Sequence, residues 1–223
     1  MSTLIAPTRP YNGAVLAESS PRRLRAKRGD GDRLRTEILD ATDQLLIEGG
    51  TTESVSIRAV ADRVGCTPPA IYLHFFDKQE LLFDVCARRF HQLSEWIDTA
   101  TEGVTDPVAA LDAGTRAYVR FGLQHPEHYR ILFMGRSILT TDQLDELRRS
   151  GVTGMSRLIE RCQACIDSGL VRSNDASTMA HSLWALSHGI VSLIIAKPQA
   201  EWPETSELVD HLLGAYLAGI RIA

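Results

Sequence analysis

The 223-residue sequence has little that would tie it to secretion or to a membrane. It contains four cysteines without the regular spacing of a disulfide framework, and a chain of this length needs no disulfides to hold its fold. Its first thirty residues include no apolar stretch long enough for a signal peptide. The longest apolar run, residues 183–196, has 14 residues and is interrupted by His188, whereas a transmembrane helix needs about 20. We therefore expect a cytoplasmic protein with reduced thiols and no membrane partner.

Motifs of the common enzyme classes are also missing. The sequence has no phosphate loop, dinucleotide fingerprint, nucleophile elbow or paired-histidine zinc motif. No segment alternates polar and apolar residues for long enough to indicate a β strand. With 44% hydrophobic and 23% charged residues, the composition is typical of a soluble globular protein. We predict an all-α protein that is not an enzyme and has no cofactor. A helical enzyme with scattered catalytic residues and a helical adaptor that does not bind DNA are the alternatives.

Positive charge is concentrated near the N-terminus. Residues 1–89 hold 13 basic and 12 acidic groups, whereas residues 90–223 hold 11 and 16. Seven of the basic groups fall within residues 22–35, against two acidic ones. A polyanion would bind at this end of the chain, although a solvated tail has the same composition. Proline and glycine without apolar periodicity predict a flexible basic arm over residues 1–31.

Apolar residues at helical spacing follow the arm to the end of the chain. Gly50 is expected to end the first helix, Ser56 to cap the second and Gly65 to end it. Thr67 is expected to cap the third through the N–H of Ala70. The predicted helices are 33–48, 57–64, 68–75, some twenty residues from 78, 107–125, 126–134, 141–168, 174–196 and 205–222.

The segment from residue 56 to residue 78 is the most informative part of the sequence. Two short amphipathic helices joined by a turn containing glycine have the form of a helix-turn-helix, whose second helix enters the major groove of DNA. A generic helical hairpin is the alternative. The second helix is too short for a good bundle member, and Ile71 and Phe75 can face the core while Tyr72 and His74 lie on other faces.

The string VADRVGCTPPAIYLHFFDKQELL resembles the DNA-binding signature of the TetR family of transcriptional regulators. The shared features are a Val-Ala pair, a glycine turn, a Tyr followed by a Phe, and Lys-x-x-Leu after a capping residue, and the similarity covers residues 33–82. It implies a three-helix DNA-binding domain over residues 32–80 and a helical effector-binding and dimerisation domain over residues 81–223. It also implies a ligand-responsive regulator, expected to be a repressor, that binds palindromic operator DNA as a homodimer until a small-molecule effector releases it.

The resemblance also implies roles for individual residues. An arginine early in the second helix and the tip of the third would approach base edges, and the tyrosine, histidine and lysine that follow would hold phosphates. The tyrosine could instead pack, and the histidine could be a plain surface residue. Because two prolines remove backbone donors at this helix start, phosphate binding should depend on side chains. The implied DNA-binding residues are Ser56, Arg58, Thr67, Pro68, Pro69, Tyr72, His74 and Lys78.

Inward-facing aromatic and soft side chains between residues 107 and 196 predict a cavity for a small, largely apolar effector, although a filled core has the same composition. The stretch from Trp184 to Gly189 is similar to the Trp-x-x-x-His-Gly pattern of one TetR subgroup. His181, Trp184 and His188 share a helical face, and the alternative is that Trp184 is core while His188 bonds to a backbone carbonyl. The candidate effector-binding residues are Tyr118, Phe121, Phe133, Met155, Trp184 and His188.

Two pairs of residues are of types that can bind a metal ion, and the last two predicted helices carry apolar surface that could form a dimer interface. Cys162 and Cys165 stand inside an amphipathic helix with no second cysteine pair, so two buried small side chains are favoured. His125 and His128 flank a proline at a helix junction, where capping explains them as well as ligation would. We assign no metal. Apolar surface on helices 174–196 and 205–222 predicts the homodimer interface.

Overall fold

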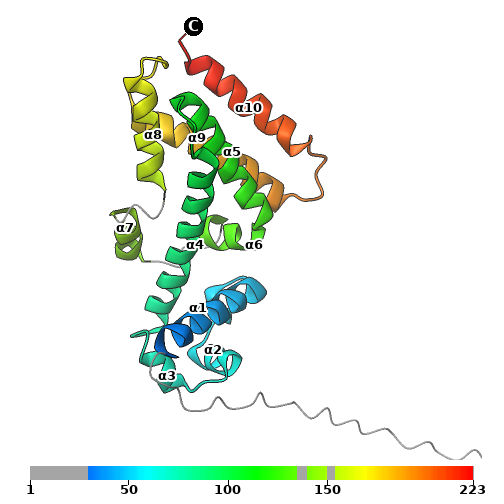
Figure 1. Cartoon of the computed structure of the whole chain (residues 1–223). Coiled ribbons are helices and arrows are strands. Elements are labelled where there is room, and N and C mark those ends of the chain that lie inside the picture. The colour runs from blue at the N-terminus through cyan, green and yellow to red at the C-terminus, as the bar shows by residue number, and fades with distance from the viewer. Residues whose placement is uncertain (1–29, 135–139, 150–153, 223) are drawn as a thin grey trace, which may run out of the picture.

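The computed structural model describes residues 30–134, 140–149 and 154–222. Over these ranges the chain is helical and has no strand, only one isolated bridge between Val171 and Arg221. Figure 1 shows a small head, formed by α1 to α3, joined by the long helix α4 to a larger body. The all-α prediction is therefore confirmed. The predicted basic arm, up to residue 29, lies outside the described residues.

The head forms its own core, and the second of its helices begins and ends where the sequence predicts. Ser56 Oγ accepts a hydrogen bond from the Ala59 N–H at 3.1 Å, and Gly65 ends the same helix in the left-handed region at φ 74°. Ile71 and Phe75, four residues apart, are both buried against the first two helices. The elements are α1 (Asp30–Gly49), a 3-10 turn η1 (Thr52–Ser54), α2 (Ile57–Val64) and α3 (Pro68–Tyr72).

Helix α4 (Lys78–Thr101) belongs to both halves of the molecule. It begins at Asp77, whose carboxylate accepts from the Glu80 N–H at 2.8 Å, while the Glu80 carboxylate accepts from the Phe76 N–H. Its first turns, with Leu81, complete the head core, and further along Leu93 packs into the body core. A change at one end of this helix can therefore reach the other.

The body packs around α5, which contacts α4, α8 and α9. Its core contains the side chains of Tyr129 and Leu183 together with Cys162 and Cys165, and both cysteines are free and fully buried, as predicted. The elements are α5 (Pro107–Gln124), α6 (Pro126–Tyr129), a π-helical segment η2 (Arg130–Met134), α7 (Thr141–Arg149), α8 (Met155–Asp167), α9 (Ala176–Ala196) and α10 (Thr205–Ile220).

Three predicted helices are wrong in their extent. The helix expected over residues 68–75 ends at Tyr72. The helix expected over residues 141–168 is two helices, because α7 ends at Arg149 and α8 begins after Gly154, whose φ of 76° lies in the left-handed region. The apolar period continues on both sides of this glycine and conceals the break. The helix expected over residues 126–134 changes to π geometry after Tyr129.

Helix α9 is the one described helix long and apolar enough to cross a membrane, with a mean hydropathy of 1.5. A single such helix is weak evidence, since the core helix of a soluble protein has the same length and composition. Eight of its residues are buried in the body, among them Leu183 and Val191. Its composition is explained by the core it helps to form.

Candidate functional site

The exposed face of the head lies on α3 and the start of α2. Thr67, Pro68 and Pro69 are exposed at the N-terminal tip of α3, and Tyr72 follows with 54% of its surface exposed. Arg58 is exposed on α2 and makes no ion pair within the described residues. Ser56 caps the start of α2, the helix that carries Arg58. Five of the eight predicted DNA-binding residues are therefore exposed on α2 or at α3, and a sixth, Ser56, is the cap of α2.

The other two residues, His74 and Lys78, have partners within the head. Lys78 Nζ donates to the carbonyl oxygen of Thr52 at 2.6 Å, which ties the start of α4 to η1. His74 is half-buried. A Cβ atom added to Gly31 of α1 would lie 3.9 Å from the His74 ring atom Cε1. Their roles as phosphate ligands stay predictions. The first turn of α1 thus lies beside His74, near α3.

The predicted cap at Thr67 is wrong. Its hydroxyl makes no capping bond, and the Ala70 N–H donates instead to the Thr67 carbonyl oxygen at 2.9 Å. This tight i to i+3 bond suits a helix of five residues that begins with two prolines. The Thr67 hydroxyl consequently stays on the exposed tip.

Two exposed apolar residues on this surface were missed. Leu73 is 85% and Phe76 86% exposed, beside Tyr72. The signal was available in the sequence, because with Ile71 and Phe75 in the core, the intervening and following positions must face outward.

The body contains a cavity of about 70 Å³ between α4, α5, α8 and α9. Four of the six predicted effector-binding residues line it, namely Tyr118, Phe133, Met155 and Trp184. Phe121 is not among the lining residues and packs instead against Trp96 and His125. His188 lies behind the wall, in ring contact with Trp184. The other lining residues were missed from the sequence. Those from α4 and α8 belong to ordinary amphipathic patterns, and the rest come from α5, α9 and the turn before α8: Leu93, Ser94, Ile97, Leu158, Arg161, Leu111, Gly114, Thr115, Leu183, Ser187 and Gly154.

A chain of hydrogen bonds leads from the cavity into α6. The Tyr118 hydroxyl, in the cavity wall, lies 2.9 Å from the Tyr129 hydroxyl, and this in turn lies 2.6 Å from His188 Nδ1. Each tyrosine hydroxyl can both donate and accept, so the two tyrosines and the histidine can satisfy one another's hydrogen bonds. Burial raises the pKa of Tyr118 to about 12 and lowers the pKa of His188, so both side chains are held uncharged in the folded protein. The expected bond from His188 to a backbone carbonyl is wrong, and His181 is exposed, away from this chain.

The head and body meet at a buried charged cluster. Asp43 on α1 accepts from Arg89 Nε on α4 at 2.8 Å, and His128 Nε2 on α6 lies 3.5 Å from the same carboxylate. The side chains of all three are at least 84% buried. Ile131 of η2 packs on the head core beside them. Two helices of the body thus contact α1 through this cluster.

The histidines flanking Pro126 are neither caps nor metal ligands within this geometry. His125 makes no capping bond and packs against the rings of Trp96 and Phe121. In the described ranges no group of three His, Cys, Asp or Glu side chains is placed to hold a metal ion. His128 has a different role, in the cluster with Asp43.

Acidification should weaken the fold through His128. Burial, followed by the positive charge of Arg89, lowers its pKa from 6.5 to about 4 despite Glu127, so the folded state holds it neutral. The unfolded chain binds a proton below pH 6.5, and stability is therefore full above that pH and falls as the pH drops towards 4. The shift alone corresponds to about 3 kcal/mol, and the nearby Asp43 carboxylate offsets part of it, so we expect about 1–2 kcal/mol.

Urea unfolding of the wild type and of His128→Asn between pH 7 and pH 4.5 measures this loss. The difference between the two proteins should shrink as the pH falls. His91→Asn, at an exposed histidine of α4, is the control and should follow the wild type. Parallel pH profiles for all three proteins would show that His128 is not held neutral by the fold.

Comparison with known proteins agrees with this architecture. Residues 38–85 match the family model for bacterial regulatory proteins of the tetR family, and residues 111–216 match a Tetracyclin repressor-like C-terminal domain. The transcriptional activator FasR of Mycolicibacterium smegmatis is 24% identical over 77% of this chain and 73% of its own. The uncharacterized regulator YobS of Bacillus subtilis is 23% identical over 83% and 91%.

Solved structures share the fold. A Rhodococcus sp. RHA1 protein of unknown function superimposes with a TM-score of 0.72 at 23% identity, covering 85% of this chain and 96% of its own. AibR, in complex with isovaleryl coenzyme A and operator DNA, gives a TM-score of 0.63 at 20% identity, covering 82% and 97%. The Trp-x-x-x-His-Gly subgroup stays a prediction. With both family models matched in order, and an N-terminal helix-turn-helix followed by a helical body, this chain belongs to the TetR family of transcriptional regulators.

Proposed function

We propose that this protein is a cytoplasmic, ligand-responsive transcriptional regulator without enzymatic activity, which binds operator DNA as a homodimer and changes its DNA affinity when a small apolar effector fills the body cavity. The observation that carries the proposal is the placement of α4. This helix starts directly after the exposed face of α3, and its later turns supply Leu93, Ser94 and Ile97 to the cavity wall. One rigid element therefore joins the two candidate sites.

The exposed face of α3 suits double-stranded DNA. Arg58 can form paired hydrogen bonds with a guanine edge, and Thr67 and the two prolines can pack on thymine methyl groups. Tyr72 can donate to a phosphate oxygen. The repressor role stays a prediction, because the relative FasR is named an activator.

Contacts between the cavity and the head offer a route for coupling. An effector that contacts Tyr118 or Trp184 changes the surroundings of Tyr129 in α6. The next residue back along the chain is His128, which contacts Asp43 of α1 in the head. Coupling by this route requires the effector to prefer one arrangement of α6, and shifts of about 1–3 kcal/mol are usual.

Replacing Arg58 with Ala tests the DNA-binding role directly. We expect operator affinity to fall by about 1–3 kcal/mol and base preference at one position to relax. Arg63→Ala is the matched control, because Arg63 lies on the same helix but is paired with Glu48 of α1. It should change affinity by less than about 0.5 kcal/mol.

An operator is first selected in vitro from a random library. Gel shifts on it and on single-base variants, at several salt concentrations, then measure the operator affinity and the base preference of each protein. Equal losses for the two arginine variants would mean that the effect is one of overall charge. Unchanged affinity for Arg58→Ala and for Tyr72→Ala would overturn the proposed DNA surface.

A second copy of this chain fits the outer face of α9 and α10. Leu193 is 52% exposed there, and added Cβ atoms on Gly189, Gly214 and Gly219 would meet no atom within 4 Å. Uncovered apolar surface next to small residues lets helices from two copies approach closely. The two heads of such a dimer would read a palindromic operator.

Leu193→Glu should convert the dimer to a monomer and reduce operator affinity at least tenfold, because it buries a charge in the interface. Leu73→Glu adds the same charge to an exposed leucine of the head and should leave the dimer intact. Sedimentation equilibrium at micromolar concentration distinguishes the two. A wild type that is monomeric yet binds DNA fully would refute the interface.

A further inference from the structure

Arg161 on α8 is the one formally charged side chain among the described residues that line the body cavity. The other polar groups in the wall are engaged inside the protein. Thr115 Oγ1 donates to the carbonyl of Leu111 at 2.8 Å, and Ser187 Oγ donates to that of Leu183 at 2.8 Å. The wall is thus apolar around a single guanidinium.

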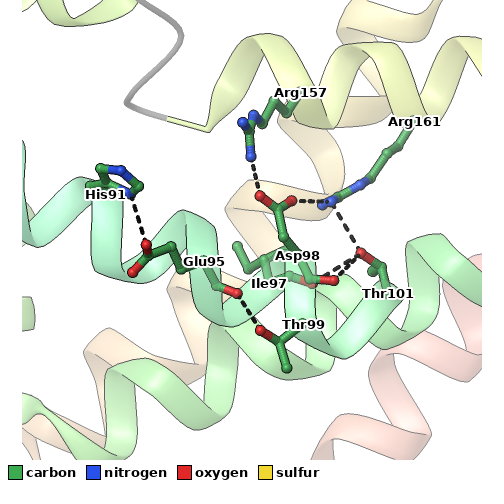
Figure 2. Close-up of polar contacts among 8 residues, drawn as sticks. All are labelled: His91, Glu95, Ile97, Asp98, Thr99, Thr101, Arg157 and Arg161. Carbon is green, nitrogen blue, oxygen red and sulfur yellow. Dashed lines mark hydrogen bonds and ion pairs between the residues drawn. The ribbon is translucent and has the colours of Figure 1, made fainter. Parts of the chain in front are cut away.

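Part of that guanidinium is open to the cavity. Arg161 Nη2 donates to Asp98 Oδ1 at 2.8 Å and to Thr101 Oγ1 at 3.2 Å, as Figure 2 shows. Nη1 and Nε make no hydrogen bond within the described ranges. Nη1 lies 3.4 Å from the position that a Cβ on Gly114 would take, and Gly114 itself lines the cavity. Nη1 therefore lies beside the part of the cavity wall that Gly114 forms.

The local charge favours an anion. Asp98 accepts from both Arg157 and Arg161, so one carboxylate serves two guanidinium groups and one positive charge is in excess (Figure 2). The nearest further acidic groups on α4 are Glu95 and Glu102, both exposed, and Glu95 faces His91 at 3.7 Å. The N–H groups of Nη1 and Nε are left to donate, so the guanidinium suits a carboxylate oxygen in hydrogen bonding as well as in charge.

We propose that the effector is a small apolar monocarboxylate, whose carboxylate binds Arg161 and whose hydrocarbon part fills the cavity between Tyr118, Leu183 and Trp184. The volume of 70 Å³ sets its size. At 10–15 Å³ for each water-sized group, it holds about five such groups, which corresponds to a chain of about five or six carbons. This inference rests on the proposed function, because it takes the cavity to be the effector site.

The test compares hexanoate with hexanamide and hexylammonium, which have the same chain but no negative charge. Calorimetry on the full-length protein without DNA should give hexanoate at least tenfold tighter binding than hexanamide, and the weakest binding for hexylammonium. Arg161→Gln should lower hexanoate affinity at least tenfold and leave hexanamide unchanged, whereas Arg161→Lys should keep part of the preference. Arg157→Gln is the matched control, since Arg157 shares Asp98 but does not line the cavity; it removes the excess charge without removing the contact, so it should lower hexanoate affinity clearly less than Arg161→Gln does.

Several outcomes would overturn the inference: no binding of hexanoate, equal binding of hexanoate and hexanamide, or an equal effect of the Arg157 and Arg161 variants. Tighter binding of hexanoyl coenzyme A that does not depend on Arg161 would also overturn it, because a thioester has no carboxylate. Should Arg161→Gln fail to fold, the comparison of the three ligands on the wild type still decides the question.

A linked titration separates this inference from the proposed function. If hexanoate binds through Arg161 but operator affinity is the same at saturating hexanoate, the carboxylate site stands and the regulatory coupling fails. If instead only an uncharged ligand both binds the cavity and changes operator affinity, the coupling stands and the carboxylate site fails. By reciprocity, the operator must change effector affinity by the same factor.

Discussion

Asp43→Ala should lower the free energy of unfolding by about 3–5 kcal/mol. Asp43 is buried between head and body, and the variant leaves the Arg89 guanidinium, itself only 16% exposed, without its carboxylate. Burial already lowers the pKa of Arg89, and in the variant only the more distant charge of Asp40 would remain to offset this desolvation. Urea unfolding at pH 7 measures the loss.

The matched control lies on the same two helices. Asp40 on α1 pairs with Arg88 of α4 at 2.7 Å, but Asp40 is 57% exposed. Asp40→Ala should therefore cost less than about 1 kcal/mol. The double variant Asp43→Leu with Arg89→Met should recover much of the loss, since it removes both charges. A loss below 1 kcal/mol for Asp43→Ala would mean that water reaches the cluster and screens it.

The head could be read almost completely from the sequence because its signals are local. Ser56, Gly65 and Asp77 act within three or four residues of their own positions, and Ile71 and Phe75 lie one turn apart. The third helix is the exception: it ends at Tyr72 and not at Phe75, and the predicted cap at Thr67 failed because a carbonyl and a hydroxyl compete for the same Ala70 N–H. Capping preferences alone do not decide between them.

The site in the body could not be predicted, because the residues that contact one another there are far apart in the sequence. Tyr118, Tyr129 and His188 meet across three helices, and no spacing in the sequence marks the contact. The same is true of Asp43 and His128, 85 residues apart. Arg161 looked like the polar face of an amphipathic helix, and only the packing of α8 against α4 and α5 turns it towards the cavity. The residue types in the body were compatible with a cavity, but only the structure shows which charged side chain lines it.

Gly122→Ala should destabilise the body by about 3 kcal/mol, although alanine is the better helix former. Gly122 lies in α5, at the point where Val191 of α9 and Tyr129 of α6 pack against this helix. An added Cβ would lie 2.5 Å from Val191 Cγ1 and 2.9 Å from Tyr129 Cδ2. Neither neighbour can move cheaply, because Val191 is fully buried and Tyr129 is held by hydrogen bonds to Tyr118 and His188.

Gly114→Ala, on the same helix, is the matched control. Its added Cβ would meet Ile97 Cγ2 at 3.3 Å, and Arg161 Nη1 and Thr101 Cγ2 at 3.4 Å. These atoms are side-chain tips that can shift by a few tenths of an ångström, so the steric cost should nearly cancel the gain of about 0.5–1 kcal/mol from replacing glycine in a helix. Urea unfolding of both variants without ligand gives the comparison. Equal stability of the two proteins would show that Val191 and Tyr129 yield without cost, and that the packing around Tyr129 is too loose to transmit a shift from the cavity to α6.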